Sequence, residues 1–540
     1  MESQNKTNYI FLTGGVISSL GKGITTSSIS ALLKSRGFSI SVIKIDGYLN
    51  YDAGLMSPYE HGEVFVTEDG GETDLDIGNY ERFIDQNLTK ENNITSGKIY
   101  FNILRKERRG EYLGKTVQVV PHVVDEIKEC IFRQGEGKDF VIVEIGGVVG
   151  DMESMSFIEA ARQIHSQFKR HSLFVHLALV PYFEHLKEVK TKPLQNSMKQ
   201  LQSQGIFPDI LICRTKYALE EKIKQKISRM TNISYDDIVE SKNIGNKYLL
   251  PLYFFKQKLD LNILWKLHKE PPVINFDNWI QLEKLLHQED QFPVVNVGFV
   301  RKYSEGTDNY VSLLEAIRHA CWHNKRKLNL VLLNTDQPQE ISEEALAALD
   351  CMIIPGGFGV RGVEQKIRAV KIFRKLNKPF LGICLGFQCA LVEMARTELG
   401  LADANSTEFD KDTANPVIEK IDLVINQTSD ETGFQFSKTL RIGGRRVKLS
   451  PGSLAREVYQ KDEVVERFRH RYSFNVKYKE QFEKLKVSFS GQNVQDEIQT
   501  YEIFELRGHK FFVGVQFHPE FLSRPFRPHP LINELIKRSN

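Results

Sequence analysis

The sequence lacks the features that mark several large classes of protein. Its 540 residues contain six cysteines and no C-x-x-C pair, so we expect reduced thiols rather than a disulfide framework or a zinc ribbon. No apolar run approaches the roughly 18 residues that span a bilayer, and the start, residues 1–8, is polar. Lys plus Arg number 72 and Asp plus Glu 69, too balanced for nucleic-acid binding by bulk charge. We therefore expect a soluble, cytoplasmic enzyme with neither a membrane nor a nucleic-acid partner.

The composition supports large cores, because 41% of the residues are hydrophobic and 10% aromatic. In the first half, short β-branched runs alternate with helix-like stretches, which predicts a mostly parallel sheet covered on both faces. A second alternating series starts at Pro293 and becomes richer in strands towards the end. The predicted strands are 9–12, 41–45, 141–145, 174–180, 210–213, 294–299, 328–333, 351–354, 380–383 and 511–517.

The segment 269–292 separates the two series. It contains KEPPVINFDNW and then a charged, helix-like piece near 282–288. Pro271 and Pro272 cannot continue a helix, so we interpret the segment as a linker. The sequence thus predicts two doubly wound α/β domains, a P-loop-like, Rossmann-type domain at 1–268 and a second domain at 293–540.

A glycine-rich segment, TGGVISSLGKGITTSS at 13–28, follows the first predicted strand. Its four glycines allow tight turns, and a helix starting near Ile24 would direct its positive end at a bound anion. Lys22 would add a positive charge. Gly23 stands where a P-loop has the Ser or Thr that binds magnesium. Either the segment is a plain glycine-rich turn, or other oxygens hold the metal.

Candidate oxygens lie in two acidic segments. EDGGETDLD at 68–76 places five acids in nine residues, and VIVEIGG leaves Glu144 at the end of a buried strand. Parallel sheets form their ligand crevice at this end, where a buried carboxylate rarely goes unpaired. Asp76 and Glu144 are therefore candidate magnesium ligands. Taken singly, Asp76 is more simply interpreted as a surface acid.

The second domain contains a candidate nucleophile. PFLGICLGFQCAL at 379–391 reads as a strand, a Gly-x-Cys-x-Gly turn and an apolar helix, the context of an exposed nucleophile. Cys384 would lie at the positive end of that helix, which favours the thiolate. GVQFHPE ends a later strand with His518 and Glu520, so the imidazole can move a proton while the carboxylate fixes its tautomer.

A third motif, PGGFG at 355–359, offers backbone N–H groups to an oxyanion, and the amides of Gly357 and Leu385 are the candidates. A lone cysteine is more often a small buried hydrophobe than a nucleophile. That interpretation does not explain the turn, the His-Pro-Glu motif and the double glycine together. We keep it for the other cysteines, which are Cys130, Cys213, Cys321, Cys351 and Cys389.

Several of these motifs resemble known families. GICLGFQ, PGGFG and FHPEF resemble the class I, triad-type glutamine amidotransferases. The synthetase domain of the CTP synthase family is similar to FLTGGVISSLGKGI, HGEVFVTEDGGETDLDIGNYERF, LRKERRGEYLGKTVQVVPH, VEIGGVVGDMES and EVKTKP. These segments occur in the expected order over nearly the whole chain. The resemblance implies an amidoligase (synthetase) domain at 1–268 and a glutamine amidotransferase domain at 293–540.

The resemblance also implies a reaction, in which UTP, ATP and glutamine give CTP, ADP, phosphate and glutamate through a 4-phosphoryl-UTP intermediate. It implies Mg²⁺ as cofactor, GTP as allosteric activator and CTP as feedback inhibitor. It further implies a homotetramer, with filaments in some members. Pro58, His61 and Val64 match residues that line the synthetase end of the ammonia path.

Site residues follow from the matching positions. Those expected to bind ATP are Ser19, Leu20, Gly21, Lys22, Gly23, Ile24, Lys44, Asp76, Lys242, Asn243 and Ile244. Those expected to bind UTP or CTP are Ser18, Asp151, Met152, Glu153, Lys190, Thr191, Lys192, Pro193, Leu194, Gln195 and Lys226. Those expected to bind glutamine are Gly357, Leu385, Gly386, Phe387, Gln388, Glu408 and Arg471. The triad is Cys384, His518 and Glu520, and the metal ligands are Asp76 and Glu144.

Three positions depart from the family pattern. Gly47 and Ala53 stand where prolines are usual, which removes a restriction on the unfolded loop. Val148 stands where threonine is usual, which removes a hydroxyl near the nucleotides. These departures leave the details of nucleotide geometry open, but none touches a group assigned to catalysis.

Two other functions fit part of the pattern. An amidoligase of the cobyric-acid type, fused to a glutaminase, would share the phosphate loop but amidate a carboxylate. A structural assembly protein with remnant enzyme domains is the alternative outside catalysis, although a scaffold has no physical use for an intact Cys384, His518, Glu520 and Lys22. CTP formation from UTP tests the first alternative, and glutamate release from glutamine tests the second.

Overall fold

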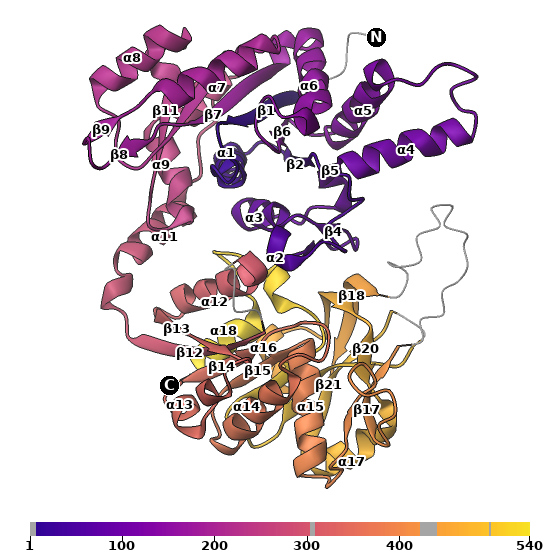
Figure 1. Cartoon of the computed structure of the whole chain (residues 1–540). Helices are drawn as coiled ribbons and strands as arrows, with labels where there is room; N and C mark the ends of the chain where they lie inside the picture. Colours follow the sequence, from indigo (N-terminus) through magenta and orange to yellow (C-terminus); the bar gives the residue numbers. More distant parts are fainter. Residues whose placement is uncertain (1–6, 303–307, 422–439, 496–497, 540) are drawn as a thin grey trace. The chain divides into compact units, whose positions relative to one another are not determined.

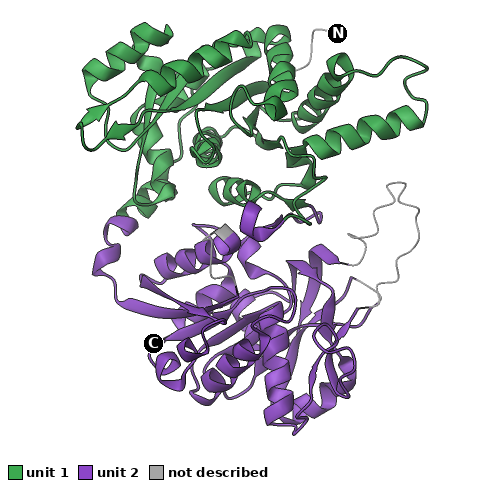
Figure 2. Ribbon diagram, viewed as in Figure 1, with its two compact units in different colours: residues 1–56, 72–284 green, residues 57–71, 285–540 purple. Residues whose placement is uncertain are grey.

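The computed structural model describes residues 7–302, 308–421, 440–495 and 498–539 (Figure 1). The chain forms two compact units (Figure 2). Unit 1 comprises residues 1–56 and 72–284, and unit 2 comprises residues 57–71 and 285–540. In the ranges given above, no helix combines the length and the apolar character needed to cross a membrane.

Unit 1 contains a seven-stranded sheet in which all neighbouring strands are parallel, in the order β11-β10-β7-β1-β6-β2-β5. The strands are β1 (Asn8–Gly15), β2 (Ile40–Asp46), β5 (Asn93–Thr95), β6 (Phe140–Ile145), β7 (Ser172–Leu179), β10 (Ile210–Thr215) and β11 (Ile238–Lys242). A small hairpin joins β8 (Tyr182–Phe183) to β9 (Glu188–Val189). The central strands are apolar and buried along their length, as a sheet covered on both faces requires.

Helices cover both faces of this sheet (Figure 1). Tyr9 and Phe11 of β1 belong to a core formed with α5 and α6. Because successive side chains of a strand point to opposite faces, Ile10 and Leu12 face the side that α1 covers. The helices of unit 1 are α1 (Lys22–Ser35), α3 (Leu75–Ile84), α4 (Ser96–Arg108), α5 (Val124–Gln134), α6 (Met155–Gln167), α7 (Lys192–Ser203), α8 (Glu221–Thr231), α9 (Leu250–Lys256) and α10 (Leu259–Lys266).

Unit 2 contains a nine-stranded mixed sheet in the order β13-β12-β14-β15-β23-β22-β21-β18-β19. The half from β13 to β23 is parallel and the half from β23 to β19 antiparallel, which accounts for the strand-rich end of the sequence. These strands are β12 (Val294–Arg301), β13 (Lys327–Asn334), β14 (Cys351–Ile354), β15 (Phe380–Ile383), β18 (Arg441–Leu449), β19 (Glu463–His470), β21 (Val487–Asn493), β22 (Tyr501–Leu506) and β23 (Phe512–Val515).

A smaller sheet contains β16 (Asn405–Ser406), β17 (Pro416–Lys420) and β20 (Tyr472–Phe474). The helices of unit 2 are α12 (Val311–His323), α13 (Glu343–Ala347), α14 (Val363–Lys375), α15 (Leu385–Thr397), α16 (Leu454–Tyr459), α17 (Lys479–Lys484) and α18 (Pro530–Lys537). Two separate apolar clusters form the core of this unit. The two α/β domains that the sequence predicts are thus confirmed as a fold class.

The segment 57–71 belongs to unit 2, although the residues on either side of it belong to unit 1. It contains α2 (Pro58–His61) and β3 (Phe65–Val66). The Phe65 ring meets the ring of Phe521 edge-on at 5.1 Å, and Arg467 donates to the carbonyl oxygen of Val66 at 3.0 Å. These contacts fix the segment beside the turn that follows β23.

The predicted linker contains a helix, α11 (Asp277–His287). The chain before it, including Pro271 and Pro272, is irregular, as expected from the two prolines. Trp279 and Leu282 are buried, so one face of α11 is covered.

Candidate active sites

The glycine-rich segment of unit 1 forms a loop between β1 and α1. Gly21 has a φ of 100°, and Lys22 is the first residue of α1. A Cβ on Gly14 would lie 2.8 Å from Cδ of Lys22, so glycine is needed there to make room for the lysine stem. Lys22 Nζ donates to the carbonyl oxygen of Gly147. The loop thus brings a helix N-terminus and an ammonium group to one place, which suits a phosphate.

The residue after Lys22 is glycine for a steric reason. A Cβ on Gly23 would lie 2.0 Å from Oδ1 of Asp76, so this carboxylate occupies the space that a serine or threonine side chain would need. Asp74 caps the N-terminus of α3 and accepts a hydrogen bond from the backbone N–H of Asp76 at 2.8 Å. The Asp76 side chain is only 19% exposed, which argues against its interpretation as a surface acid.

Lys44 lies among carboxylates at the end of β2. Its Nζ is 2.7 Å from Oδ2 of Asp76 and 3.0 Å from Oε1 of Glu144, and Tyr80 donates to the other oxygen of Glu144. Burial lowers the pKa of Lys44, but the surrounding carboxylates outweigh it and raise that pKa well above its usual value. Burial, only partly offset by Lys44, raises the pKa of Asp46 to about 7.

This cluster fits a magnesium ion by its chemistry. Four carboxylates, those of Asp46, Asp74, Asp76 and Glu144, surround the single ammonium group of Lys44, and oxygen donors are the ligands that magnesium prefers. Over the described ranges, no three His, Cys, Asp or Glu side chains converge as a ready-made metal site. Phosphate oxygens and water would therefore complete the coordination of an ion held by Asp76 and Glu144.

The other residues expected to bind nucleotides lie beyond the carboxyl ends of parallel strands, where ligand crevices form. They are 18–21 after β1, 151–153 after β6, 190–195 after β7, and 242–244, which begins at the last residue of β11. Lys190 pairs with Glu188 at 2.7 Å. Lys226 is exposed on α8, which follows β10.

In unit 2, Cys384 occupies a sharp turn between β15 and α15. Its φ of 51° and ψ of −100° lie in a region that residues with side chains rarely adopt. A Cβ on Gly382 would lie 2.6 Å from the carbonyl oxygen of Gly386, and one on Gly386 would lie 2.2 Å from that of Ile354. The turn that presents the cysteine therefore requires both flanking glycines.

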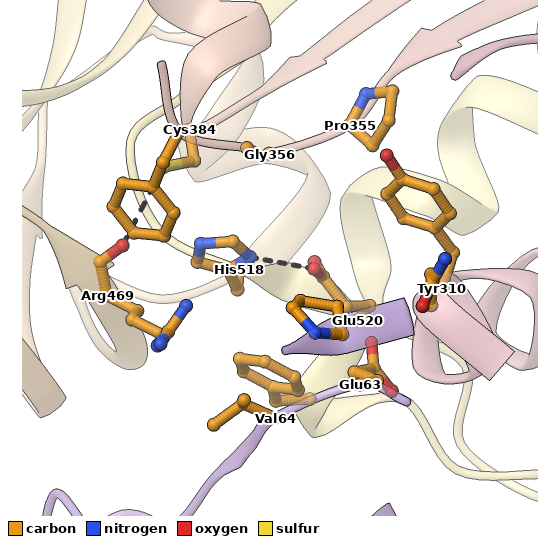
Figure 3. Close-up of a pocket in the computed structure, with 14 residues that line it drawn as sticks. Glu63, Val64, Tyr310, Pro355, Gly356, Cys384, Arg469, His518 and Glu520 are labelled. Atoms are coloured by element: carbon orange, nitrogen blue, oxygen red, sulfur yellow. Dashed lines mark hydrogen bonds and ion pairs between the residues drawn. The ribbon is translucent and has the colours of Figure 1, made fainter. Parts of the chain in front are cut away.

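Cys384, His518 and Glu520 meet at one pocket (Figure 3). His518 Nδ1 lies 2.8 Å from Oε1 of Glu520, and no described residue hydrogen-bonds to its Nε2. Burial lowers the pKa of His518, but the charges of Glu520 and Cys384 outweigh burial and raise it to about 10. The histidine is thus held as an imidazolium beside the sulfur.

The loop after β14 forms part of the pocket wall beside His518. Gly356 faces the pocket, because a Cβ there would lie 2.7 Å from Cε1 of His518 and 3.4 Å from Cβ of Cys384. The side chains of Cys384 and His518 thus flank one glycine, so Cys384 is not isolated in the core although it is 3% exposed. Gly357 also lines the pocket, where its amide can serve an oxyanion.

The segment 57–71 supplies part of the same pocket. Pro58, Glu63 and Val64 line it together with Cys384 and His518 (Figure 3). One oxygen of Glu63 accepts the backbone N–H of Ser312 in the first turn of α12, at 2.9 Å. His61, predicted together with Pro58 and Val64, is not among the lining residues.

Of the residues expected to bind glutamine, Gly357 lines the pocket and the other six, all described, do not. Leu385, Gly386, Phe387 and Gln388 are buried in the first turn of α15. Glu408 accepts the backbone N–H of Gly359 at 2.7 Å and so supports the loop after β14.

Some residues of this site were not predicted from the sequence. Glu63, Tyr310 and Arg469 line the pocket, and Gln516 places its amide nitrogen 3.7 Å from Cys384 Sγ. Gln516 lies within the GVQFHPE motif, two residues before His518, so its nearness to the site could have been predicted from the sequence. The other three come from separate segments that only the fold brings together.

Comparisons with known proteins identify the families that the chain resembles. A family model described as CTP synthase N-terminus matches residues 8–269, and one described as glutamine amidotransferase class-I matches residues 306–538. The glutaminase domain of Trypanosoma brucei CTPS with bound acivicin is 31% identical, with a TM-score of 0.41, and covers 46% of this chain and 94% of that chain.

Relatives match over the full length. A CTP synthase of Caldanaerobacter subterraneus is 46% identical over 98% of this chain and 97% of its own length. Those of Aquifex aeolicus and Methanocaldococcus jannaschii are 45% and 47% identical, over 98% of this chain and 98% of their own lengths. The chain therefore belongs to the CTP synthase family of glutamine-hydrolysing ligases.

Proposed function

We propose that this protein aminates UTP to CTP at the expense of ATP, using ammonia that it releases from glutamine. The observation that carries the proposal is the separation of two chemical centres. Unit 2 has a cysteine paired with a His–Glu couple, and unit 1 has a phosphate loop with an ammonium–carboxylate cluster. Each centre suits one half of the reaction.

In unit 2, the thiolate of Cys384 would attack the side-chain amide carbon of glutamine. His518 would give its proton to the departing nitrogen, while Glu520 holds the imidazole in position. The amides of Gly357 and Leu385 would stabilise the oxyanion. Water would then hydrolyse the thioester and release glutamate, which returns the cysteine to its starting state.

In unit 1, the γ-phosphoryl group of ATP would move to O4 of UTP, giving 4-phosphoryl-UTP and ADP. Ammonia would then attack C4 and phosphate would leave. Lys22, which contacts Gly147, and Lys44, which contacts Asp76, would neutralise charge on the transferring group. Asp76 and Glu144 would hold magnesium, which supplies further charge neutralisation.

The proposal extends to regulation and location. The family resemblance supports GTP as an activator, CTP as a feedback inhibitor, a homotetramer that forms filaments in some members, and a cytoplasmic enzyme. Pro58 and Val64, which the resemblance assigns to the synthetase end of the ammonia path, line the Cys384 pocket instead, so they are candidates for the start of that path.

Replacing Cys384 tests the division of labour. Cys384→Ala should abolish glutamine-dependent CTP formation and spare CTP formation from added ammonia, because the phosphate loop is in the other unit. Cys389→Ala is a matched control on the same helix, since burial raises the pKa of Cys389 to about 12 and keeps it a thiol. Equal loss of both activities in a folded Cys384→Ala protein would contradict the proposal.

The complementary test uses Lys22. Lys22→Ala should lose CTP formation from both glutamine and ammonia, while glutamate release continues. Full ammonia-dependent activity in this variant would remove the loop from catalysis. If the wild-type protein releases ADP with ammonia but makes no CTP from UTP, an amidoligase of another specificity becomes the better interpretation.

A further inference from the structure

Gln516 places its carboxamide beside the sulfur of Cys384. It follows β23, is fully buried, and its Nε2 lies 3.7 Å from Cys384 Sγ. The backbone N–H of Cys384 donates to Val515, the neighbour of Gln516, at 2.7 Å, so the two side chains are fixed by adjacent peptide groups. The contact is within hydrogen-bond range for a sulfur acceptor.

The orientation of the Gln516 carboxamide is determined by a chain of contacts. The carbonyl oxygen of Tyr472 can only accept, so the group of Gln388 that lies 3.0 Å from it must be the amide nitrogen. The same nitrogen has a second hydrogen, which it directs at Oε1 of Gln516, 3.4 Å away. Gln516 must therefore turn its own NH₂ group towards Cys384 Sγ.

The polar groups on two sides of the sulfur prefer different protonation states. The backbone carbonyl of Arg469 lies 3.9 Å from Sγ and can interact favourably only with a protonated thiol. The NH₂ group of Gln516 stabilises the anion, since hydrogen bonds to charged acceptors are the stronger ones. Without Gln516, His518 would be the remaining side chain that stabilises the anion against this carbonyl.

We propose that Gln516 is a catalytic residue that holds Cys384 as a thiolate, and that Gln388 is a positioning residue that fixes the direction of the Gln516 amide. The inference rests on the proposed role of Cys384 as nucleophile and adds a neutral donor to it. Charged groups that also face the cysteine and its pocket come from other elements and are kept in the test. They are Glu63, Lys366 of α14, Arg469 of β19, His518 and Glu520.

The test measures how fast iodoacetamide alkylates Cys384 in the full-length protein as a function of pH, with the modified peptide quantified by mass spectrometry. Gln516→Leu removes the donor. We expect the alkylation midpoint to rise by about one pH unit, which is about a tenfold lower thiolate fraction well below the midpoint. kcat/KM for glutamine hydrolysis should fall in parallel at neutral pH and recover at high pH.

Two further variants make the outcome decisive. Gln388→Met leaves Gln516 in place without its orienting donor, and should shift the midpoint in the same direction by a smaller amount. Gln492→Leu makes the same change at an exposed position of β21 and should leave the midpoint unchanged. If Gln516→Leu does not fold, the Gln388→Met profile decides.

The proposal would be overturned if the alkylation midpoint of the folded Gln516→Leu protein were unchanged, whether or not its activity is lower at every pH. A purely structural role of Gln516 would lower the activity without moving the alkylation profile. If Cys384 is not the nucleophile, the experiments give a different result. In that case Cys384→Ala would still hydrolyse glutamine, whatever the alkylation profiles show.

Discussion

Adding one methyl group at Gly356 should disable the glutaminase centre selectively. The new Cβ would lie 2.7 Å from Cε1 of His518, and ordinary contacts begin at 3.4 Å, so the ring must retreat by 3.4 − 2.7 = 0.7 Å. His518 is enclosed by Glu520 and Phe521, which limits how it can move. Because a displacement of about 1 Å can cost about 100-fold in rate, we expect Gly356→Ala to lose roughly 10- to 100-fold in kcat for glutamine hydrolysis.

The assay compares three activities of each purified variant, namely glutamate release, CTP formation with glutamine and CTP formation with ammonia. Gly357→Ala is the matched comparison, because its Cβ would meet only Cδ2 of Leu385 at 3.4 Å and should cost far less. Ammonia-dependent activity should be unchanged in both variants. Equal glutaminase rates for Gly356→Ala and Gly357→Ala would refute the steric reasoning, as would full activity in Gly356→Ala.

Three further predictions concern other groups. Gly23→Ala should abolish ammonia-dependent CTP formation, since the added Cβ would displace the Asp76 carboxylate; activity within twofold of the parent would contradict this. Glu520→Gln should lower the pKa of His518 from about 10, moving the alkaline limb of the glutaminase pH–rate profile to lower pH, whereas an unmoved limb would exclude the carboxylate as the cause. Burial lowers the pKa of His176 to about 3, so below pH 6.5 the unfolded chain binds a proton at this residue that the folded chain does not. The free energy of unfolding therefore decreases as the pH is lowered. Between pH 7 and pH 5 this costs about 2 kcal/mol, which urea unfolding should show in the parent and not in His176→Gln.

The backbone turns at both centres could be predicted from the sequence. The Gly-x-Cys-x-Gly turn is recognisable because a Cβ at either glycine would lie only 2.6 Å or 2.2 Å from a backbone carbonyl oxygen. Both positions therefore require glycine, and few sequences meet this requirement by chance. The same holds for the glycine-rich loop that admits Lys22. The departure at Gly23 looked like a defect in the P-loop pattern, and the structure explains it by the carboxylate of Asp76.

Other features depend on contacts between distant parts of the chain and could not be predicted in this way. Glu63 reaches Ser312 and Val66 reaches Arg467, across separations of 249 and 401 residues. No local pattern assigns the segment 57–71 to unit 2. The helix α11 begins earlier than the helix-like piece expected near 282–288, because prolines at 271 and 272 prevent a helix there but do not prevent one from starting at Asp277.

The membership of the segment 57–71 in unit 2 has a practical consequence for anyone who wishes to study the glutaminase half alone. A recombinant fragment that starts at Leu285 would retain the cysteine, the histidine and the glutamate. It would lack three residues that wall the pocket, Pro58, Glu63 and Val64, and would leave the ring of Phe521 uncovered on the side where Phe65 packs. Supplying residues 57–71 as a synthetic peptide, or fusing them ahead of the fragment, would restore the enclosure.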